Sequence, residues 1–100
     1  MRAFPGQLQI DIRRRDIIFG ERGSACYCPA ALAARRALGR RGLQKLRMQL
    51  LLGGLRVFAG DSRWPLAGYD IPGELQQWML NFDSELRCSP ASFILTKKKD

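Results

Sequence analysis

The 100-residue chain contains no histidine. It therefore lacks the side chain whose pKa best suits proton transfer near neutral pH, and with it the Ser-His and Cys-His pairs of nucleophilic catalysis. Histidine-containing zinc sites and histidine-ligated haem are excluded as well. No G-x-x-x-x-G-K-[ST] or G-x-G-x-x-G phosphate loop occurs, and the carboxylates form no close pair typical of a glycosidase or a two-metal site. We therefore predict a protein that is not an enzyme and needs no cofactor.

Long apolar segments are also missing. The most apolar stretch, Met48–Ala59, is interrupted by Gly53, Gly54 and Arg56, and it is shorter than the roughly 20 residues that a membrane-spanning helix needs. Residues 1–12 contain no continuous apolar region of the kind found in secretory signals. We therefore expect a cytoplasmic protein without a membrane partner.

Cysteine is scarce, with three residues at positions 26, 28 and 88. Cys26, Cys28 and Cys88 could supply three thiolates, but the Cys-x-Cys spacing differs from that of a zinc knuckle and a fourth ligand is missing, so no metal site is predicted. Cys28 stands at the start of a predicted helix, whose dipole would lower the pKa of its thiol. The alternative is burial, because free cysteine packs as a small apolar residue.

Positive charge is what the chain has in excess, with a formal net charge of +8. Residues 1–50 carry eleven basic and three acidic residues, whereas residues 51–100 carry six of each. The whole excess therefore lies in the first half. A partner recognised through charge is expected to meet residues of that half.

The apolar pattern predicts an α+β fold. Alternation over residues 8–12, 45–50 and 55–59 indicates strands, and a last short strand is expected at 93–95. A Pro-initiated, Ala-rich helix is expected over 29–38, after a short helical turn at 16–19. A second helix follows Pro72, with Leu75, Trp78, Met79 and Phe82 on one face. We predict a single domain over residues 1–100, with a small, mostly antiparallel sheet in the order β-α-β-β-α-β, helices packed on one face and a frayed tail at 97–100.

The two central strands are expected to form a hairpin. Gly53 and Gly54 suit the two central positions of a tight turn, because glycine accepts positive φ at both. This register would place Leu50 opposite Val57 and Gln49 opposite Phe58. One face of the hairpin would then be apolar and the other basic and aromatic.

Arginine outnumbers lysine thirteen to four, and its planar fork suits bidentate contacts with phosphate. Phe58 among basic residues could serve as a stacking platform for a nucleic-acid base. The alternative is that the arginines only solvate the surface. The predicted binding surface comprises Arg13, Arg14, Arg15, Arg35, Arg36, Arg40, Arg41, Lys45, Arg47, Arg56 and Phe58.

Four short segments carry a resemblance. They are Asp16 to Gly20, Cys28-Pro29-Ala30-Ala31-Leu32-Ala33, Asn81-Phe82-Asp83 and Pro90-Ala91-Ser92-Phe93. Together they resemble a set of small, uncharacterised tailed-bacteriophage proteins with a Cys-Pro-initiated helix and a C-terminal Pro-x-x-Phe strand. The resemblance implies a phage origin, a compact α+β fold and residence in the host-cell cytoplasm, and it carries over no functional residue.

Three functions remain open from the sequence. The first is a phage accessory protein that sterically inhibits a host protein or nucleoprotein complex, for instance as an anti-CRISPR or other anti-defence factor. The second is direct binding of DNA or RNA as a regulator or coating protein, and the third is a virion or assembly component. Trp64-Pro65-Leu66 and Tyr69 form a candidate protein-contact patch, unless they close the edge of the core. The protein could be a monomer or a homodimer paired through the strand at 7–12.

Overall fold

An antiparallel five-stranded sheet forms the body of the protein, whose computed structural model describes residues 4–99. The strand order in the sheet is β1-β5-β4-β3-β2. The predicted α+β class with an antiparallel sheet is confirmed. Along the chain the elements are β1 (Gln7–Ile12), α1 (Arg14–Phe19), α2 (Pro29–Arg40), β2 (Leu46–Leu51), β3 (Gly54–Ala59), β4 (Ala67–Asp70), α3 (Gly73–Asp83) and β5 (Ala91–Lys97).

The observed order therefore differs from β-α-β-β-α-β in two elements. The helical turn expected at 16–19 is a separate short helix, α1, and β4 is a strand that the pattern did not indicate. β4 has only four residues, and just two of them, Ala67 and Tyr69, are buried. A period of two repeated once is too short a signal to separate a strand from a loop.

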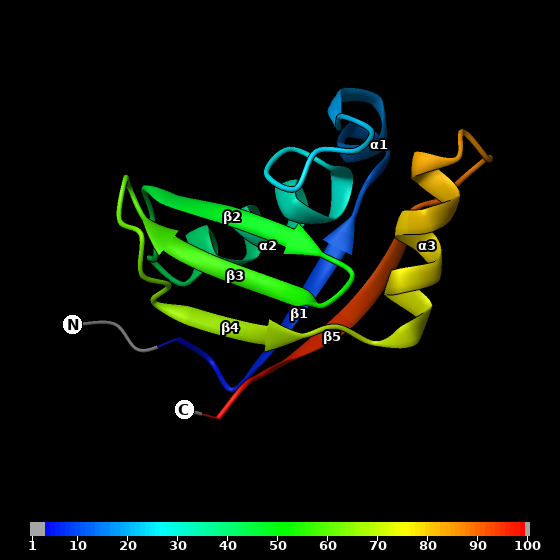
Figure 1. The fold of residues 1–100 in the computed structure, drawn as a ribbon. Coiled ribbons are helices and arrows are strands. Elements are labelled where there is room, and N and C mark those ends of the chain that lie inside the picture. Colours follow the sequence, from blue (N-terminus) through cyan, green and yellow to red (C-terminus); the bar gives the residue numbers. More distant parts are fainter. Residues whose placement is uncertain (1–3, 100) are drawn as a thin grey trace.

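The sheet curls around α2. Although β1 and β2 are the two edge strands, α2 contacts both of them, and Figure 1 shows β1 and β5 crossing β2–β4 at a steep angle. The side of α2 that faces the core is thin because its buried residues are mostly alanines. Small side chains allow close approach of helix and sheet, which explains why an Ala-rich helix occupies this place.

The helix after Pro72 is present, and the face predicted for it is buried. Leu75, Trp78, Met79 and Phe82 all belong to the core. The Trp78 ring is stacked on that of Phe82 with centroids 5.7 Å apart, and its indole Nε1 donates a hydrogen bond of 3.0 Å to the carbonyl oxygen of Ser89. This bond connects α3 to the segment that leads into β5.

The hairpin forms, but the predicted register is wrong by two residues. Leu50 pairs with Leu55 instead of Val57, so the two turn residues are Leu52 and Gly53. Gly54 lies within β3 with φ +135°, and a Cβ there would come within 2.6 Å of the carbonyl oxygen of Tyr69. Gly54 is therefore needed for close approach of β4, and the turn does not require it. Because a shift of two keeps side-chain parity, most of the predicted apolar face still points into the core, whereas Leu52 lies in the turn and is 45% exposed.

The end of the chain is more ordered than expected. β5 continues to Lys97, and the backbone N–H of Lys98 donates to the carbonyl oxygen of Gly68 at 2.8 Å. Lys97 and Lys98, which were predicted to lie in a frayed tail, are therefore bonded to the sheet. Residue 100, the last of the predicted tail, lies outside the described residues. The hydrogen bond to Gly68 fixes the backbone from which the Lys98 side chain extends.

Candidate functional site

Arg36 is engaged within the protein. Its Nη1 and Nη2 donate to the two carboxylate oxygens of Asp16 at 2.8 and 2.7 Å, and Nη2 also donates to the carbonyl oxygen of Asp11 at 2.6 Å. The Asp16 carboxylate is buried, and it also accepts the backbone N–H of Arg13 at 2.8 Å. The Arg36 guanidinium, which was predicted to bind a phosphate, instead joins α2 to α1 and β1. We therefore remove Arg36 from the predicted binding surface.

The ionisation of Asp16 reflects this network. Burial opposes the charged carboxylate, but the hydrogen bonds from Arg36 and from the Arg13 backbone outweigh it, so the pKa of Asp16 lies below its ordinary value. The hydrogen bonds that Arg36 donates to Asp16 in turn raise the pKa of Arg36 above its ordinary value. The pair is therefore ionised at neutral pH.

Phe58 is not available as a stacking platform. The residue is only 6% exposed, and the guanidinium of Arg47 lies over its ring, 4.4 Å from the centroid. Arg47 also donates from Nε to the carbonyl oxygen of Gly60 at 3.2 Å and from Nη2 to that of Ser62 at 2.9 Å. Arg47 thus covers Phe58 and holds the loop after β3, so the prediction of Phe58 as a stacking platform is wrong.

Arg35 is half-buried and contacts an aromatic ring. Its guanidinium lies 5.6 Å from the ring centroid of Tyr27, and its Nε atom is buried without a hydrogen-bond partner. Together with Arg15, Phe19 and Leu32 it lines a shallow cleft between α1 and α2. Arg35 therefore belongs to the surface around α1.

The remaining predicted cations are exposed and lie on several elements. Arg13 precedes α1, and Arg14 and Arg15 lie in its first turn; Arg40 and Arg41 lie at the end of α2, Lys45 just before β2, and Arg56 on β3. By element they fall into an α1 region, an α2-end region and a sheet region.

The α1 region contains two apolar residues that sequence reasoning did not include. Ile18 and Phe19 are 66% and 76% exposed, whereas Ile17 packs against the core. Their signal was present in the sequence, because a six-residue helix cannot bury three consecutive large side chains on one face. We call Arg14, Arg15, Ile18 and Phe19 the α1 patch.

The predicted Trp64–Tyr69 patch is divided. Trp64 is 80% exposed and Leu66 50%, so these two are available at the surface. Tyr69 is fully buried, and its hydroxyl donates a 2.6 Å hydrogen bond to the carbonyl oxygen of Pro5. Tyr69 is therefore a core residue that connects β4 to the segment before β1.

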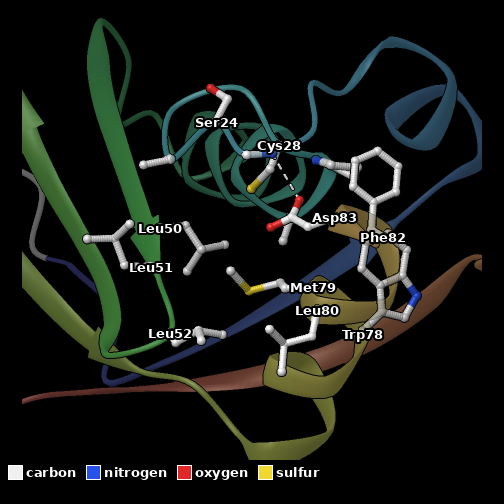
Figure 2. A pocket seen from close by; sticks show the side chains of 14 residues that line it. Ser24, Cys28, Leu50, Leu51, Leu52, Trp78, Met79, Leu80, Phe82 and Asp83 are labelled. Carbon is white, nitrogen blue, oxygen red and sulfur yellow. Dashed lines mark hydrogen bonds between the residues drawn. The ribbon is translucent and has the colours of Figure 1, made fainter. Parts of the chain in front are cut away.

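Cys28 lies in an apolar pocket of about 140 Å³ between the start of α2, the end of β2 and α3 (Figure 2). Burial raises the pKa of its thiol, and the Asp83 carboxylate on the facing helix acts in the same sense; together they outweigh the backbone N–H groups at the start of α2. The expected lowering by the helix dipole is therefore wrong. The carboxylate of Asp83 accepts the backbone N–H of Gly23 at 3.0 Å, which closes one side of the pocket.

Neither a metal site nor a membrane span stands out in the described part of the chain. Within residues 4–99, no three His, Cys, Asp or Glu side chains cluster as metal ligands would, and none of the helices there has the length and apolar content to cross a bilayer. Comparison of the chain with protein-family models, with curated proteins and with solved structures finds no match.

Proposed function

We propose that the protein acts by binding, as a small phage-type accessory protein that sterically inhibits a host protein or nucleoprotein complex, in the manner of an anti-CRISPR or other anti-defence factor. The observation that carries this proposal is the α1 patch, where Ile18 and Phe19 stand out from a short helix beside Arg14 and Arg15. Neighbouring exposed apolar side chains are typical of surfaces that a partner covers.

The composition of the α1 patch supports a protein partner. Interfaces are enriched in aromatic residues and arginine, and their central anchors are side chains that fill pockets of the partner. Phe19 supplies such an anchor, while Arg14 and Arg15 favour an acidic partner surface. The carboxylate within the helix, that of Asp16, is engaged by Arg36 and so does not offset the two arginines.

The contacts that hold α1 against the rest of the protein also support the proposal. Asp16 accepts from Arg36 and from the Arg13 backbone N–H, and Ile17 packs against the core. The helix is therefore held in place before any partner arrives. A preorganised surface loses less conformational entropy on binding, which favours affinity.

Affinity capture from host lysate, before and after nuclease treatment, tests the proposal. Three tagged proteins are compared: the wild type, an α1 variant (Arg14→Glu, Arg15→Glu, Ile18→Ser and Phe19→Ser) and a control variant. The control carries Leu86→Ser and Arg87→Glu, which change an exposed apolar residue and an adjacent exposed arginine outside the α1 patch. Circular dichroism establishes that all three are folded.

We expect the wild type and the control to retain the same host protein after nuclease treatment, and the α1 variant to lose it. Equal capture by the α1 variant and the wild type would contradict the assignment to α1. Loss of all captured protein after nuclease treatment would contradict a protein partner.

A further inference from the structure

The sheet has an outer face that carries positive charge. Residues opposite one another in neighbouring strands share a face, and Arg47 pairs with Phe58, Gln49 with Arg56, and Arg56 with Gly68. The residues that alternate with them, among them Met48, Leu50 and Val57, are buried in the core. We call the surface formed by Arg47, Gln49, Arg56, Phe58 and Gly68 the outer sheet face.

Lys98 extends this face across β4. Its Cδ lies 3.5 Å from the position that a Cβ of Gly68 would occupy, so the glycine makes room for the lysine chain. Its Nζ donates to the carbonyl oxygen of Gly53 at 3.3 Å and lies 3.8 Å from the Asp70 carboxylate. Lys98 is therefore held over the sheet, on the side that carries Arg56.

Arg56 and Lys98 together border a hollow. The hollow has a volume of about 160 Å³ and is lined by Gln49, Leu51, Gly53, Gly54, Arg56 and Lys98. Two cations thus border one space, and the exposed Gly53 beside it has no side chain to fill it. Such a space suits a phosphate group, because it offers charge and hydrogen-bond donors without steric obstruction.

An exposed aromatic ring lies at the other end of β3. Trp64 stands in the loop between β3 and β4, opposite the end that carries the β2–β3 turn (Figure 1). The loop is fixed by the hydrogen bonds from Arg47 and by Ser62, whose Oγ accepts the backbone N–H of Trp64 at 3.2 Å. Lys45 is tied to the same loop, since its carbonyl oxygen accepts the N–H of Gly60 at 3.4 Å. The backbone of the loop is therefore fixed, and the Trp64 side chain that it carries is 80% exposed.

We propose that the outer sheet face binds single-stranded nucleic acid, with a base stacked on Trp64 and backbone phosphates at Arg56 and Lys98. Aromatic side chains beside a positively charged surface are the usual combination for single strands. β3 spans about 13 Å from Phe58 to Gly54 at about 3.3 Å per residue, so a strand of several nucleotides is needed to reach from the hollow at one end of β3 to the Trp64 loop at the other. This site is distinct from the α1 patch and does not depend on the function proposed for it.

The chemistry favours a single strand over a duplex. A duplex keeps its base faces stacked, so they cannot reach the indole. An acidic protein could use the cations as well, so the experiment below includes protein capture as an outcome that decides against a single strand.

Binding of labelled oligothymidylate of about 12 nucleotides, followed by fluorescence anisotropy and by tryptophan emission at several salt concentrations, tests the proposal. We expect quenching of the wild-type emission on binding. Trp64→Ala is expected to remove the quenching and to weaken binding about tenfold. Arg56→Glu with Lys98→Glu is expected to lower the steepness of the salt dependence by about 0.7 for each phosphate that is no longer neutralised.

Two controls complete the experiment. Arg14→Glu with Arg15→Glu removes the same charge from the α1 patch and is expected to reduce affinity much less than Arg56→Glu with Lys98→Glu. A duplex of the same length is expected to bind more weakly than the single strand. The proposal is overturned by absence of binding at about 50 mM salt, by equal loss of affinity in the two charge variants, or by equal affinity for the duplex. The proposal of nucleic-acid binding is also overturned if a protein, and no nucleic acid, is found to bind the outer sheet face. Each of these results leaves the function proposed for the α1 patch unaffected.

Discussion

Arg36 and Asp16 form a two-pronged ion pair with N–O distances of 2.8 and 2.7 Å, and this pair joins α2 to α1. A planar guanidinium matches a carboxylate in this geometry, so the two hydrogen bonds fix orientation as well as distance. Asp16 is also held by the backbone N–H of Arg13. The pair therefore determines how the α1 patch is presented to solvent.

Asp16→Asn is expected to destabilise the protein because it leaves the Arg36 guanidinium without its counter-ion. Removal of one partner from a fully buried pair costs about 3–5 kcal/mol. We expect about 2–3 kcal/mol here, since the Arg36 side chain retains 19% exposure. Urea unfolding measures the loss, with the exposed Asp61→Asn as a control that should change stability by less than about 0.5 kcal/mol.

The same pair predicts a pH dependence. The pKa of Asp16 is lower in the folded than in the unfolded protein, so its contribution is fully present above the unfolded value of about 3.9. It is lost as the pH falls through the folded value. The difference in free energy of unfolding between wild type and Asp16→Asn should therefore be constant from about pH 5 to 7 and shrink below about pH 4. A difference that is unchanged at low pH would contradict this account.

The two tryptophans are expected to respond in opposite ways to truncation. Trp78 is buried, stacks on Phe82 and donates to Ser89, so Trp78→Ala should cost about 3–5 kcal/mol or unfold the protein. Trp64 is exposed, and its ordering contacts are made by its backbone, so Trp64→Ala should be nearly neutral. Thermal melts followed by circular dichroism compare the two. Wild-type stability of Trp78→Ala would refute the packing described for α3.

The neighbouring glycines of the hairpin distinguish the observed register from the predicted one. Gly54→Ala introduces a Cβ 2.6 Å from the Tyr69 carbonyl oxygen at φ +135°, and we expect it to cost more than about 1 kcal/mol. Gly53→Ala meets no atom within 4 Å and should be close to neutral. Both are compared by urea unfolding. Equal effects of the two substitutions would favour a turn centred on both glycines and contradict the register.

Cys28 is expected to be unreactive in the folded protein, because it is buried and its thiol pKa is raised. Cys26 and Cys88 are partly exposed. After brief treatment with iodoacetamide, peptide mapping by mass spectrometry should find Cys28 the least modified of the three. Preferential modification of Cys28 would contradict the burial of its thiol.

The parts of the fold that follow a regular pattern could be predicted from the sequence. The alternation at Leu8, Ile10 and Ile12 and the helical spacing from Leu75 to Phe82 each bury one face, and one periodicity identifies each. β4 is too short to carry such a pattern. The hairpin register depends on the approach of Tyr69 to Gly54, a contact between residues distant in sequence.

The binding surface was only partly predictable for a different reason. The sequence shows where the charged residues lie along the chain, but it does not show which arginines form ion pairs or hydrogen bonds within the folded protein. Arg36 forms an ion pair with Asp16, which lies twenty residues earlier in the chain. Arg47 covers Phe58 and fixes the loop that follows β3. The run from Ile17 to Phe19 indicated that a short helix would leave large side chains exposed, but which of the three packs against the core depends on the position of α1.

Photo-crosslinking in the host cell tests the central claim, that α1 contacts a protein partner, most directly. A photoreactive phenylalanine replaces Phe19 in one protein and the exposed Leu86 in the other, so that both probes face solvent. We predict one discrete crosslinked host protein from position 19, abolished by Arg14→Glu with Arg15→Glu, and none from position 86. Absence of a crosslink from position 19, or the same products from both positions, would contradict the account.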